Sequence, residues 1–179
     1  MTPRVLRSAL HVSTALVLLT LLDSWQLLKL TLLAGGVVAL VVETVRLRSP
    51  AMAGGLQRLV PVFRAAEARR PSGAAWLFVA YALVAWLPPP APAAAVLAGA
   101  LADPAAALVG GRWGRGAAKS WPGTGAALAV GSLALLVWGL PLHTALAAGA
   151  LGAALERWSP FNDNLLIAPG VGLVVWLLV

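Results

Sequence analysis

The chain contains no cysteine and few acidic residues. The absence of cysteine excludes a disulfide framework, a zinc–thiolate site and a thiol nucleophile. Only 11% of the 179 residues are charged, with six Asp and Glu against 13 Lys and Arg, whereas a soluble domain usually has about 25% charged residues. This shortage of charge argues against a soluble globular protein.

Apolar residues take the place of the missing charge. They make up 60% of the sequence, and the mean hydropathy is +0.88, whereas soluble domains are about 45–50% apolar. The composition predicts an integral membrane protein. The length suits one membrane domain over residues 1–179. The first apolar run lacks a clear cleavage site, so we expect it to be a retained helix and not a signal peptide.

The apolar stretches predict an all-α, polytopic transmembrane helix bundle. A bilayer core about 30 Å thick needs roughly 20 apolar residues per helix, and proline or glycine separates most of the apolar runs of this chain. This reading gives about seven spans. The expected spans cover residues 5–22, 27–47, 72–88, 92–110, 123–140, 143–158 and 164–179.

The basic residues predict the orientation of these spans. Seven spans place the N-terminus and the loops 48–71, 111–122 and 159–163 on one side, which holds 12 of the 13 Lys and Arg once the span ends are counted. The positive-inside rule makes that side, including the N-terminus, cytoplasmic. We expect a protein of a prokaryotic cytoplasmic membrane. This asymmetry also accounts for most of the net charge of +7, so nucleic-acid binding is not needed to explain it.

The longest cytoplasmic loop contains an amphipathic segment. Leu56, Leu59, Val60 and Phe63 recur at helical spacing and predict a short helix over residues 54–66. This helix either lies in the membrane interface or packs on the cytoplasmic end of the bundle.

Ionisable residues within the spans indicate a functional site. Such residues are energetically costly in a membrane and usually face a bundle interior or an aqueous cavity. At 1.5 Å per residue they all fit one cytoplasmic band about 10 Å deep. The residues in this band are His11, Glu43, Glu67, Asp103, Lys119, Glu156, Asp163 and Asn164.

Each of these residues also has a structural interpretation. Asp103 precedes Pro104 and is suited to cap a restarted half-helix. A lone His11 is typical of a hydrogen-bonded packing residue. The available ion-pair partners are Arg46 or Arg48 for Glu43, and Arg7 or Arg157 for Glu156.

A phosphate-binding element is predicted at residues 119–124. Lys119 is followed by Ser120, Gly123 and Thr124 at the start of the expected fifth span. A helix N-terminus offers unpaired N–H groups and partial positive charge, which suit phosphate. The spacing of a Walker A loop is absent.

The order of three segments resembles the polyprenol kinase family, which includes dolichol kinase, phytol kinase and the CTP-dependent diacylglycerol kinase. The segments are DPAAALVGGRWG (103–114), KSWPGT (119–124), and ER followed by NDN (156–164). The residues that fill the family's three patterns are Asp103, Ala106, Gly110, Gly114, Lys119, Ser120, Gly123, Thr124, Glu156, Asp163 and Asn164. Residues that match its earlier signatures are Arg7, His11, Glu43, Arg46 and Glu67, with residues 71–74.

The resemblance implies transfer of the γ-phosphoryl group of a nucleoside triphosphate to a membrane lipid alcohol at the cytoplasmic leaflet. It implies CTP as donor and Mg²⁺ as cofactor. The short RGAA segment and Pro122 depart from the family pattern, which leaves ATP open as donor. The acceptor is an isoprenoid alcohol such as polyprenol or phytol, or diacylglycerol.

The resemblance also implies a role for each matching residue. The catalytic residues are Asp103, Lys119, Glu156 and Asp163, and the metal ligands are Asp103 and Asp163. The nucleotide-binding residues are Gly110, Arg112, Gly114, Arg115, Lys119, Ser120, Gly123, Thr124 and Asn164. The supporting residues are His11, Glu43, Arg46 and Glu67. Which aspartate accepts the alcohol proton stays open, as does the oligomeric state.

Two other functions fit the same composition. A cytidylyltransferase that makes a CDP-lipid needs similar nucleotide and magnesium groups. A small transporter would use the polar band as a substrate pathway, although the expected outer half holds little beyond Asp23 and Lys29.

Overall fold

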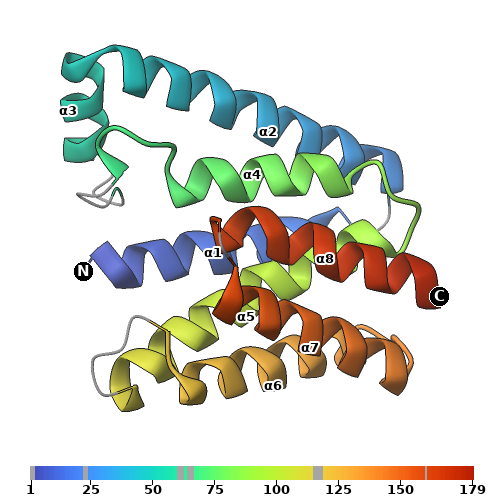
Figure 1. Cartoon of the computed structure of the whole chain (residues 1–179). Coiled ribbons are helices and arrows are strands. Elements are labelled where there is room, and N and C mark those ends of the chain that lie inside the picture. Colours follow the sequence, from blue (N-terminus) through green and yellow to red (C-terminus); the bar gives the residue numbers. More distant parts are fainter. Residues whose placement is uncertain (1–2, 22–23, 60–62, 64–66, 115–118, 160) are drawn as a thin grey trace.

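The computed structural model describes residues 3–21, 24–59, 63, 67–114, 119–159 and 161–179. Within this part of the chain all regular structure is helical, with eight helices and no strand, which confirms the all-α class. The helices are α1 (Pro3–Thr20), α2 (Trp25–Arg48), α3 (Pro50–Leu59), α4 (Gly73–Val84), α5 (Ala91–Trp113), α6 (Trp121–Val137), α7 (Leu142–Trp158) and α8 (Asp163–Leu178). Apart from α3, successive helices run back and forth along the bundle (Figure 1).

Polar residues placed before apolar runs determine where several helices begin. The Ser24, Ser72 and Ser120 hydroxyls accept hydrogen bonds from backbone N–H groups in the first turns of α2, α4 and α6. The Asn162 side chain accepts from the Asn164 N–H at the start of α8. These caps satisfy N–H groups that an isolated helix end leaves unpaired.

Helix α5 is the centre of the bundle. It packs against α1, α4, α6, α7 and α8, and 61% of its most apolar 18-residue window is buried. Seven of the twelve residues from Ala91 to Ala102 are alanine, and all of the twelve except Leu101 are buried. Small side chains let neighbouring backbones approach closely, which explains how one helix contacts five others.

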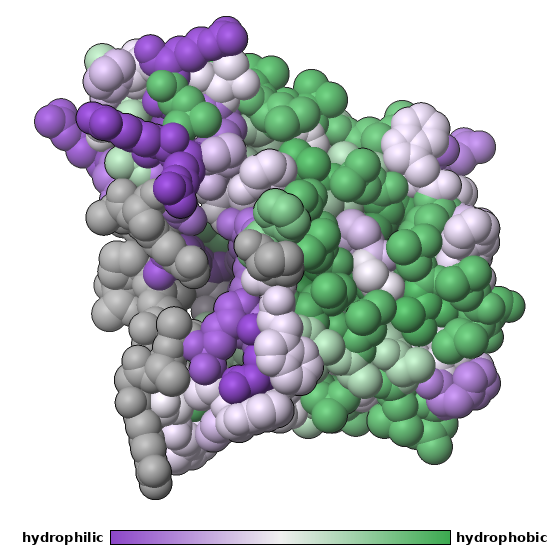
Figure 2. All heavy atoms as spheres, viewed as in Figure 1, coloured by the Kyte–Doolittle hydropathy of each residue, from purple (hydrophilic) through white to green (hydrophobic). Residues whose placement is uncertain are grey.

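The outer surface of the bundle is strongly apolar. Among the described residues, helix α2 packs mainly on α4 and α3, and just 22% of its apolar window is buried. Large apolar side chains are also exposed on α6 and α8, where Val137 is 81% and Leu177 is 73% accessible. Figure 2 shows that apolar residues cover most of the visible face, whereas polar residues gather at one end. A soluble monomer rarely exposes so large an apolar surface.

By length and composition, two of the described helices could cross a membrane. These are α2 with 24 residues and α5 with 23 residues. Helices α4, α6 and α8 are apolar but shorter, with 12, 17 and 16 residues. The structure therefore establishes the helical class and an apolar exterior.

The amphipathic segment differs from its prediction. Helix α3 covers Pro50–Leu59 instead of residues 54–66, and Val60 lies outside the described residues. Pro50 has the fixed φ that suits a first helical position, whereas a proline at position 61 disfavours continuation. Phe63 is not helical, and its ring lies 4.9 Å from the Arg46 guanidinium carbon. The predicted four-residue stripe therefore does not lie on one helix.

A second difference concerns Asp103. Helix α5 continues through Pro104 without interruption. The expected restarted half-helix is therefore wrong, and Asp103 is not a helix cap. Because the buried face of α5 contacts several helices, tertiary packing outweighs the local penalty of an internal proline.

The contact between α2 and α4 depends on a glycine. A Cβ at Gly36 on α2 would lie 2.6 Å from the Ala82 Cβ and 3.3 Å from the Phe78 carbonyl oxygen on α4. We expect Gly36→Ala to lower the free energy of unfolding by about 1–3 kcal/mol, because it overpacks this contact. The thermal unfolding midpoint in detergent measures the change.

Gly125→Ala is the matched control for this prediction. No atom lies within 4 Å of a Cβ built at Gly125, so the same change there should leave stability unchanged or raise it, since alanine is the better helix former. Equal midpoints for the two variants would contradict the close α2–α4 contact.

Candidate functional site

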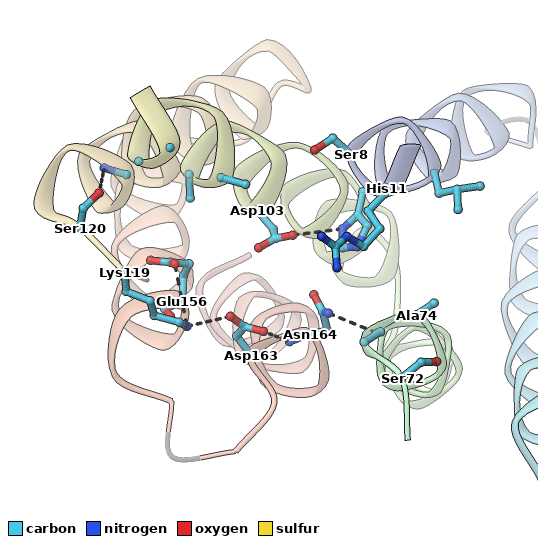
Figure 3. Close-up of a pocket in the computed structure, with 18 of the residues that line it drawn as sticks. Ser8, His11, Ser72, Ala74, Asp103, Lys119, Ser120, Glu156, Asp163 and Asn164 are labelled. Atoms are coloured by element: carbon cyan, nitrogen blue, oxygen red, sulfur yellow. Dashed lines mark hydrogen bonds and ion pairs between the residues drawn. The ribbon is translucent and has the colours of Figure 1, made fainter. Parts of the chain in front are cut away.

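A cavity of about 470 Å³ lies at the polar end of the bundle. Its walls come from α1, α5, α7 and the starts of α4, α6 and α8 (Figure 3). The polar side chains that line it are Arg7, Ser8, His11, Glu67, Ser72, Asp103, Lys119, Ser120, Glu156, Asp163 and Asn164. The structure thus brings together residues that are up to 157 positions apart, from Arg7 to Asn164.

Three helix N-termini converge on this cavity. Ser72 caps α4 and Ser120 caps α6, and both line the cavity. Asp163 and Asn164 line it from the first turn of α8. Each N-terminus carries a partial positive charge from its helix dipole. The cavity therefore combines three positive helix ends and the Lys119 ammonium, which suit phosphate oxygens, with the four carboxylates that also line it.

The Lys119 ammonium is held by oxygen atoms of α7 and α8. Its Nζ donates to Asp163 Oδ2 at 2.7 Å and to the Glu156 backbone carbonyl, and it lies 3.8 Å from Glu156 Oε1. Thr124 Oγ1 contacts Glu156 Oε2 at 3.5 Å from the neighbouring helix. Thr124 thus acts on the cavity through Glu156. Glu156 pairs with Lys119, which was not among its expected partners.

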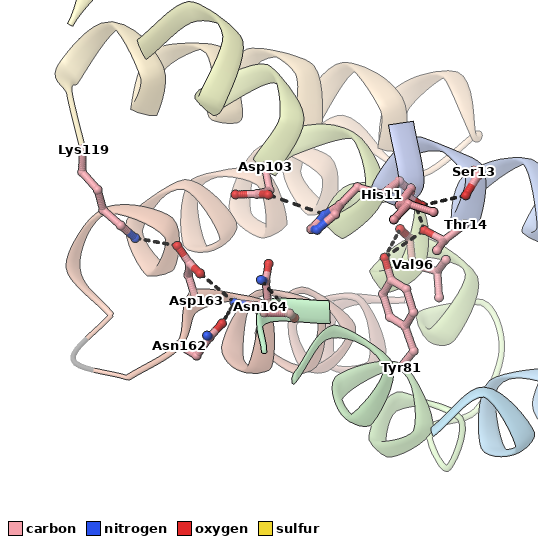
Figure 4. A network of polar contacts seen from close by, with 12 residues as sticks. His11, Ser13, Thr14, Tyr81, Val96, Asp103, Lys119, Asn162, Asp163 and Asn164 are labelled. Atoms are coloured by element: carbon pink, nitrogen blue, oxygen red, sulfur yellow. Dashed lines mark hydrogen bonds and ion pairs between the residues drawn. The ribbon is translucent and has the colours of Figure 1, made fainter. Parts of the chain in front are cut away.

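A second polar group forms the deep wall of the cavity. Asp103 Oδ2 lies 3.5 Å from His11 Nδ1, so α5 and α1 meet through this pair. Behind it, Thr14 Oγ1 donates to the His11 carbonyl at 2.6 Å and lies 3.2 Å from the Tyr81 hydroxyl (Figure 4). Tyr81 is almost fully buried. These contacts connect the cavity wall to the interior of α4.

The sequence analysis did not single out Tyr81, Thr14 or Ser8. Tyr81 is the chain's single tyrosine and stands in an otherwise apolar segment, and a buried tyrosine hydroxyl usually needs a partner. Ser8 precedes His11 by one helical turn, so both side chains share a face of α1. These two signals were available in the sequence.

Glu43 and Arg46 do not line the cavity. They form a buried ion pair on α2, called the Glu43–Arg46 brace below, that supports the start of α4. Arg46 Nη2 donates to Glu43 Oε1 at 2.5 Å and to the Arg70 carbonyl at 2.7 Å. Glu43 Oε1 accepts from the Ser72 N–H at 2.7 Å, and its Oε2 accepts from the Ser72 hydroxyl at 3.1 Å. The pair on α2 therefore fixes the start of α4.

The start of α4 is tied in turn to the start of α8. The Gly73 N–H donates to Glu67 Oε1 at 3.0 Å, and Asn164 Nδ2 donates to the Gly73 carbonyl at 3.2 Å. A Cβ at Gly73 would lie 2.8 Å from Asn164 Nδ2. A side chain at position 73 would therefore displace the Asn164 amide from this contact. Glu67 and Asn164 both line the cavity while they hold this turn.

The glycines of the two central segments bring α5 and α6 together. A Cβ at Gly110 would lie 2.9 Å from Ser120 Oγ, and one at Gly123 would lie 2.9 Å from the Ala106 carbonyl oxygen. Gly114 is buried against Ser120 and does not line the cavity. These glycines position Ser120. Gly110 and Gly123 also leave open space in the cavity wall.

One arginine expected at the nucleotide, Arg112, does not line the cavity. Arg112 is exposed, and its guanidinium carbon lies 5.5 Å from the Trp113 ring. It follows Gly111, which lines the cavity, and one residue turns a helix by about 100°. Arg112 therefore points away from the cavity. Arg115 lies outside the described residues.

The carboxylates of the cavity suit a metal ion whose remaining ligands come from a bound substrate. Among the described residues no group of three or more His, Asp and Glu side chains could hold a metal ion by itself. Asp103, Glu156 and Asp163 nevertheless all line one cavity, and Mg²⁺ is often bound by one or two carboxylates together with substrate phosphates. The donor set fits Mg²⁺ in that mode.

Comparisons with protein-family models, with curated proteins and with solved structures found no match. The geometry of the cavity and the order of its residues in the sequence therefore carry the functional argument.

The Glu43–Arg46 brace can be tested by its effect on stability. Both side chains are less than 10% exposed, so removing one partner leaves a buried charge uncompensated. We expect Glu43→Ala to lower the free energy of unfolding by about 3–5 kcal/mol, as measured by thermal unfolding in detergent.

The double variant Glu43→Leu/Arg46→Leu provides the control. It removes both charges together, so it should be clearly less destabilised than Glu43→Ala. A double variant as unstable as the single one would show that the ion pair is not the reason for the loss.

Proposed function

We propose that this protein transfers the γ-phosphoryl group of a nucleoside triphosphate, with CTP preferred, to the hydroxyl group of a membrane lipid alcohol. The observation that carries the proposal is the convergence of Lys119, three helix N-termini and the carboxylates of Asp103, Glu156 and Asp163 in one cavity. Phosphoryl transfer depends mainly on positioning and on stabilising charge around the phosphates. The cavity offers backbone N–H groups that can position phosphates and charged side chains that can stabilise their charge.

The reaction assigns a role to each wall of the cavity. Lys119, Ser120 and the backbone at the start of α6 bind phosphate oxygens. Asp103 or Asp163 accepts the proton of the alcohol. The alcohol oxygen bonds to the γ-phosphorus as the bond to the β–γ bridging oxygen breaks, and the nucleoside diphosphate leaves. Asp103 and Asp163 would hold Mg²⁺, or one of them would hold it while the other serves as the base, and the ion would supply neutralisation of the phosphate charge.

The same proposal includes a polytopic arrangement of seven spans with a cytoplasmic N-terminus. The alternating helix directions and the apolar exterior support it (Figures 1 and 2). Exposed tryptophans at both ends of the bundle match an aromatic belt. They are Trp113, Trp121 and Trp158 near the cavity and Trp86 and Trp176 near the other end. The shorter helices imply a locally thinned bilayer.

Basic residues accompany these tryptophans. The Arg157 guanidinium carbon lies 3.8 Å from the Trp121 ring centroid, and Lys29 Nζ lies 4.4 Å from that of Trp86. Pairs of this kind keep the charge at the polar boundary while the apolar stem covers the bundle. They mark both boundaries of the apolar surface.

A lipid acceptor has a lateral route to the cavity. Ala107 and Gly111 line the cavity and also a second, mostly apolar hollow of about 500 Å³ on the outer side of α5. Leu108 and Trp113 are part of this hollow. A hydroxyl group passing over Ala107 and Gly111 would reach the phosphates while its hydrocarbon chain stays outside the bundle.

A cytidylyltransferase would use a similar nucleotide site. Its product differs, because it releases pyrophosphate and forms a CDP-lipid, whereas a kinase releases a nucleoside diphosphate and forms a lipid monophosphate. Product identity therefore separates the two reactions directly.

The activity is tested with the purified protein in lipid or detergent, with Mg²⁺, CTP or ATP, and a panel of isoprenoid alcohols and diacylglycerol. We expect a lipid monophosphate and CDP. Asp103→Asn and Lys119→Met should each lower kcat/KM at least about 100-fold, since each removes a charged group that contacts the phosphates, the metal or the acceptor.

Lys29→Met is the matched control for Lys119→Met, because Lys29 lies at the opposite end of the bundle over Trp86. It should leave turnover unchanged. Full turnover in both site variants would remove this assignment, and release of pyrophosphate would replace the kinase with the cytidylyltransferase.

The orientation is tested by labelling, because the chain has no native cysteine. Gln57→Cys on α3 and His143→Cys in the first turn of α7 are exposed positions at opposite ends of the bundle. A membrane-impermeant maleimide should label the His143 variant in intact cells and the Gln57 variant only after permeabilisation. The reverse pattern would invert the proposed topology.

A further inference from the structure

The Lys119 ammonium occupies a position that is built from oxygen donors. Asp163 Oδ2 lies 2.7 Å from Nζ, Glu156 Oε1 lies 3.8 Å away, and the Glu156 backbone carbonyl accepts a hydrogen bond. The other oxygen of Asp163, Oδ1, accepts from the Asn164 N–H at 3.0 Å. Two carboxylates and a carbonyl are the donor types that divalent cations such as Mg²⁺ and Mn²⁺ select.

A metal ion cannot take this position while Lys119 stays in it. Mg²⁺ binds carboxylate oxygens at about 2.0–2.1 Å, so an ion on Asp163 Oδ2 would compete for the lone pairs that Nζ uses at 2.7 Å. A divalent ion and an ammonium at such short separation also repel each other strongly. The lysine and the metal ion are therefore alternative occupants.

The Lys119 side chain can reach a second position near the start of α6. It directly precedes Ser120, the cap of α6, and its side chain is 34% exposed on a flexible four-carbon stem. Phosphate oxygens bound at the start of α6 would supply the negative charge that Lys119 loses when it leaves Asp163. Phosphate thus favours the move that opens the position to a metal ion.

We propose that Lys119 is an internal competitor of divalent metal ions for the oxygen atoms of Asp163. Without nucleotide the lysine holds these oxygens and metal binding is weak. When a nucleotide binds, Lys119 moves to its phosphates and the metal ion takes the carboxylates of Asp163 and Asp103. The nucleotide part of this statement rests on the proposed function, whereas the competition in the nucleotide-free protein does not.

The competition is measured as Mn²⁺ binding to the nucleotide-free protein in detergent, by the loss of the free Mn²⁺ signal in electron paramagnetic resonance. We expect Lys119→Met to lower the Kd for Mn²⁺ at least tenfold relative to wild type. Lys29→Met, at the other end of the bundle, should leave the Kd unchanged. Adding Asp163→Asn to Lys119→Met should abolish the gain, which assigns it to this position.

Equal Kd values for wild type and Lys119→Met would overturn the proposal, whatever the phosphoryl-transfer assay gives. Tighter Mn²⁺ binding in Lys119→Met without any phosphoryl transfer by wild type would support the competition and remove the kinase. Lys119→Gln, which keeps a polar chain without charge, replaces the methionine variant if that protein does not purify in a folded state.

Discussion

The constraint on which this structure depends is that a charged side chain in an apolar bundle must find a partner. Glu43 meets Arg46 and the start of α4, and Lys119 meets Asp163 and Glu156. Each such contact joins helices whose apolar faces alone would pack in several ways, because hydrophobic packing is non-directional. The polar end of the bundle is therefore where the relative positions of α2, α4, α6, α7 and α8 are fixed.

Most of the helical architecture follows from the sequence, since apolar runs and serine caps are local features. The expected spans 27–47 and 92–110 correspond closely to α2 and α5. The span 72–88 is too long, because α4 ends at Val84 and the chain turns before three consecutive prolines. The amphipathic helix predicted over residues 54–66 differs for a similar reason. Its spacing describes an ideal helix, whereas the prolines at positions 50 and 61 limit where a helix can begin and continue.

The sequence predicts how deep each site residue lies in the bundle, but not which way its side chain points. Counting residues from a span end places His11, Asp103 and Glu156 in one band about 10 Å deep, and all three line the cavity. The same count does not give the angle around each helix axis. Arg112 lies at the right level and points away, and Glu43 and Arg46 brace the turn behind the cavity. The partner of Glu156 was missed because Lys119 is 37 residues distant and meets it only through the packing of α6 on α7.

Apart from Asp103, the wall that α5 presents to the cavity consists of Ala106, Ala107, Gly110 and Gly111. None of these residues has a side-chain rotamer to change. The backbone therefore sets the shape of this part of the wall. Only the flexible side chains of Lys119 and Arg7, or movements of whole helices, can adapt the cavity to a ligand. In an evolving lineage, the bulk of an accepted molecule at this wall would change in discrete steps, one added or removed methyl group at a time, and never by gradual adjustment of flexible side chains.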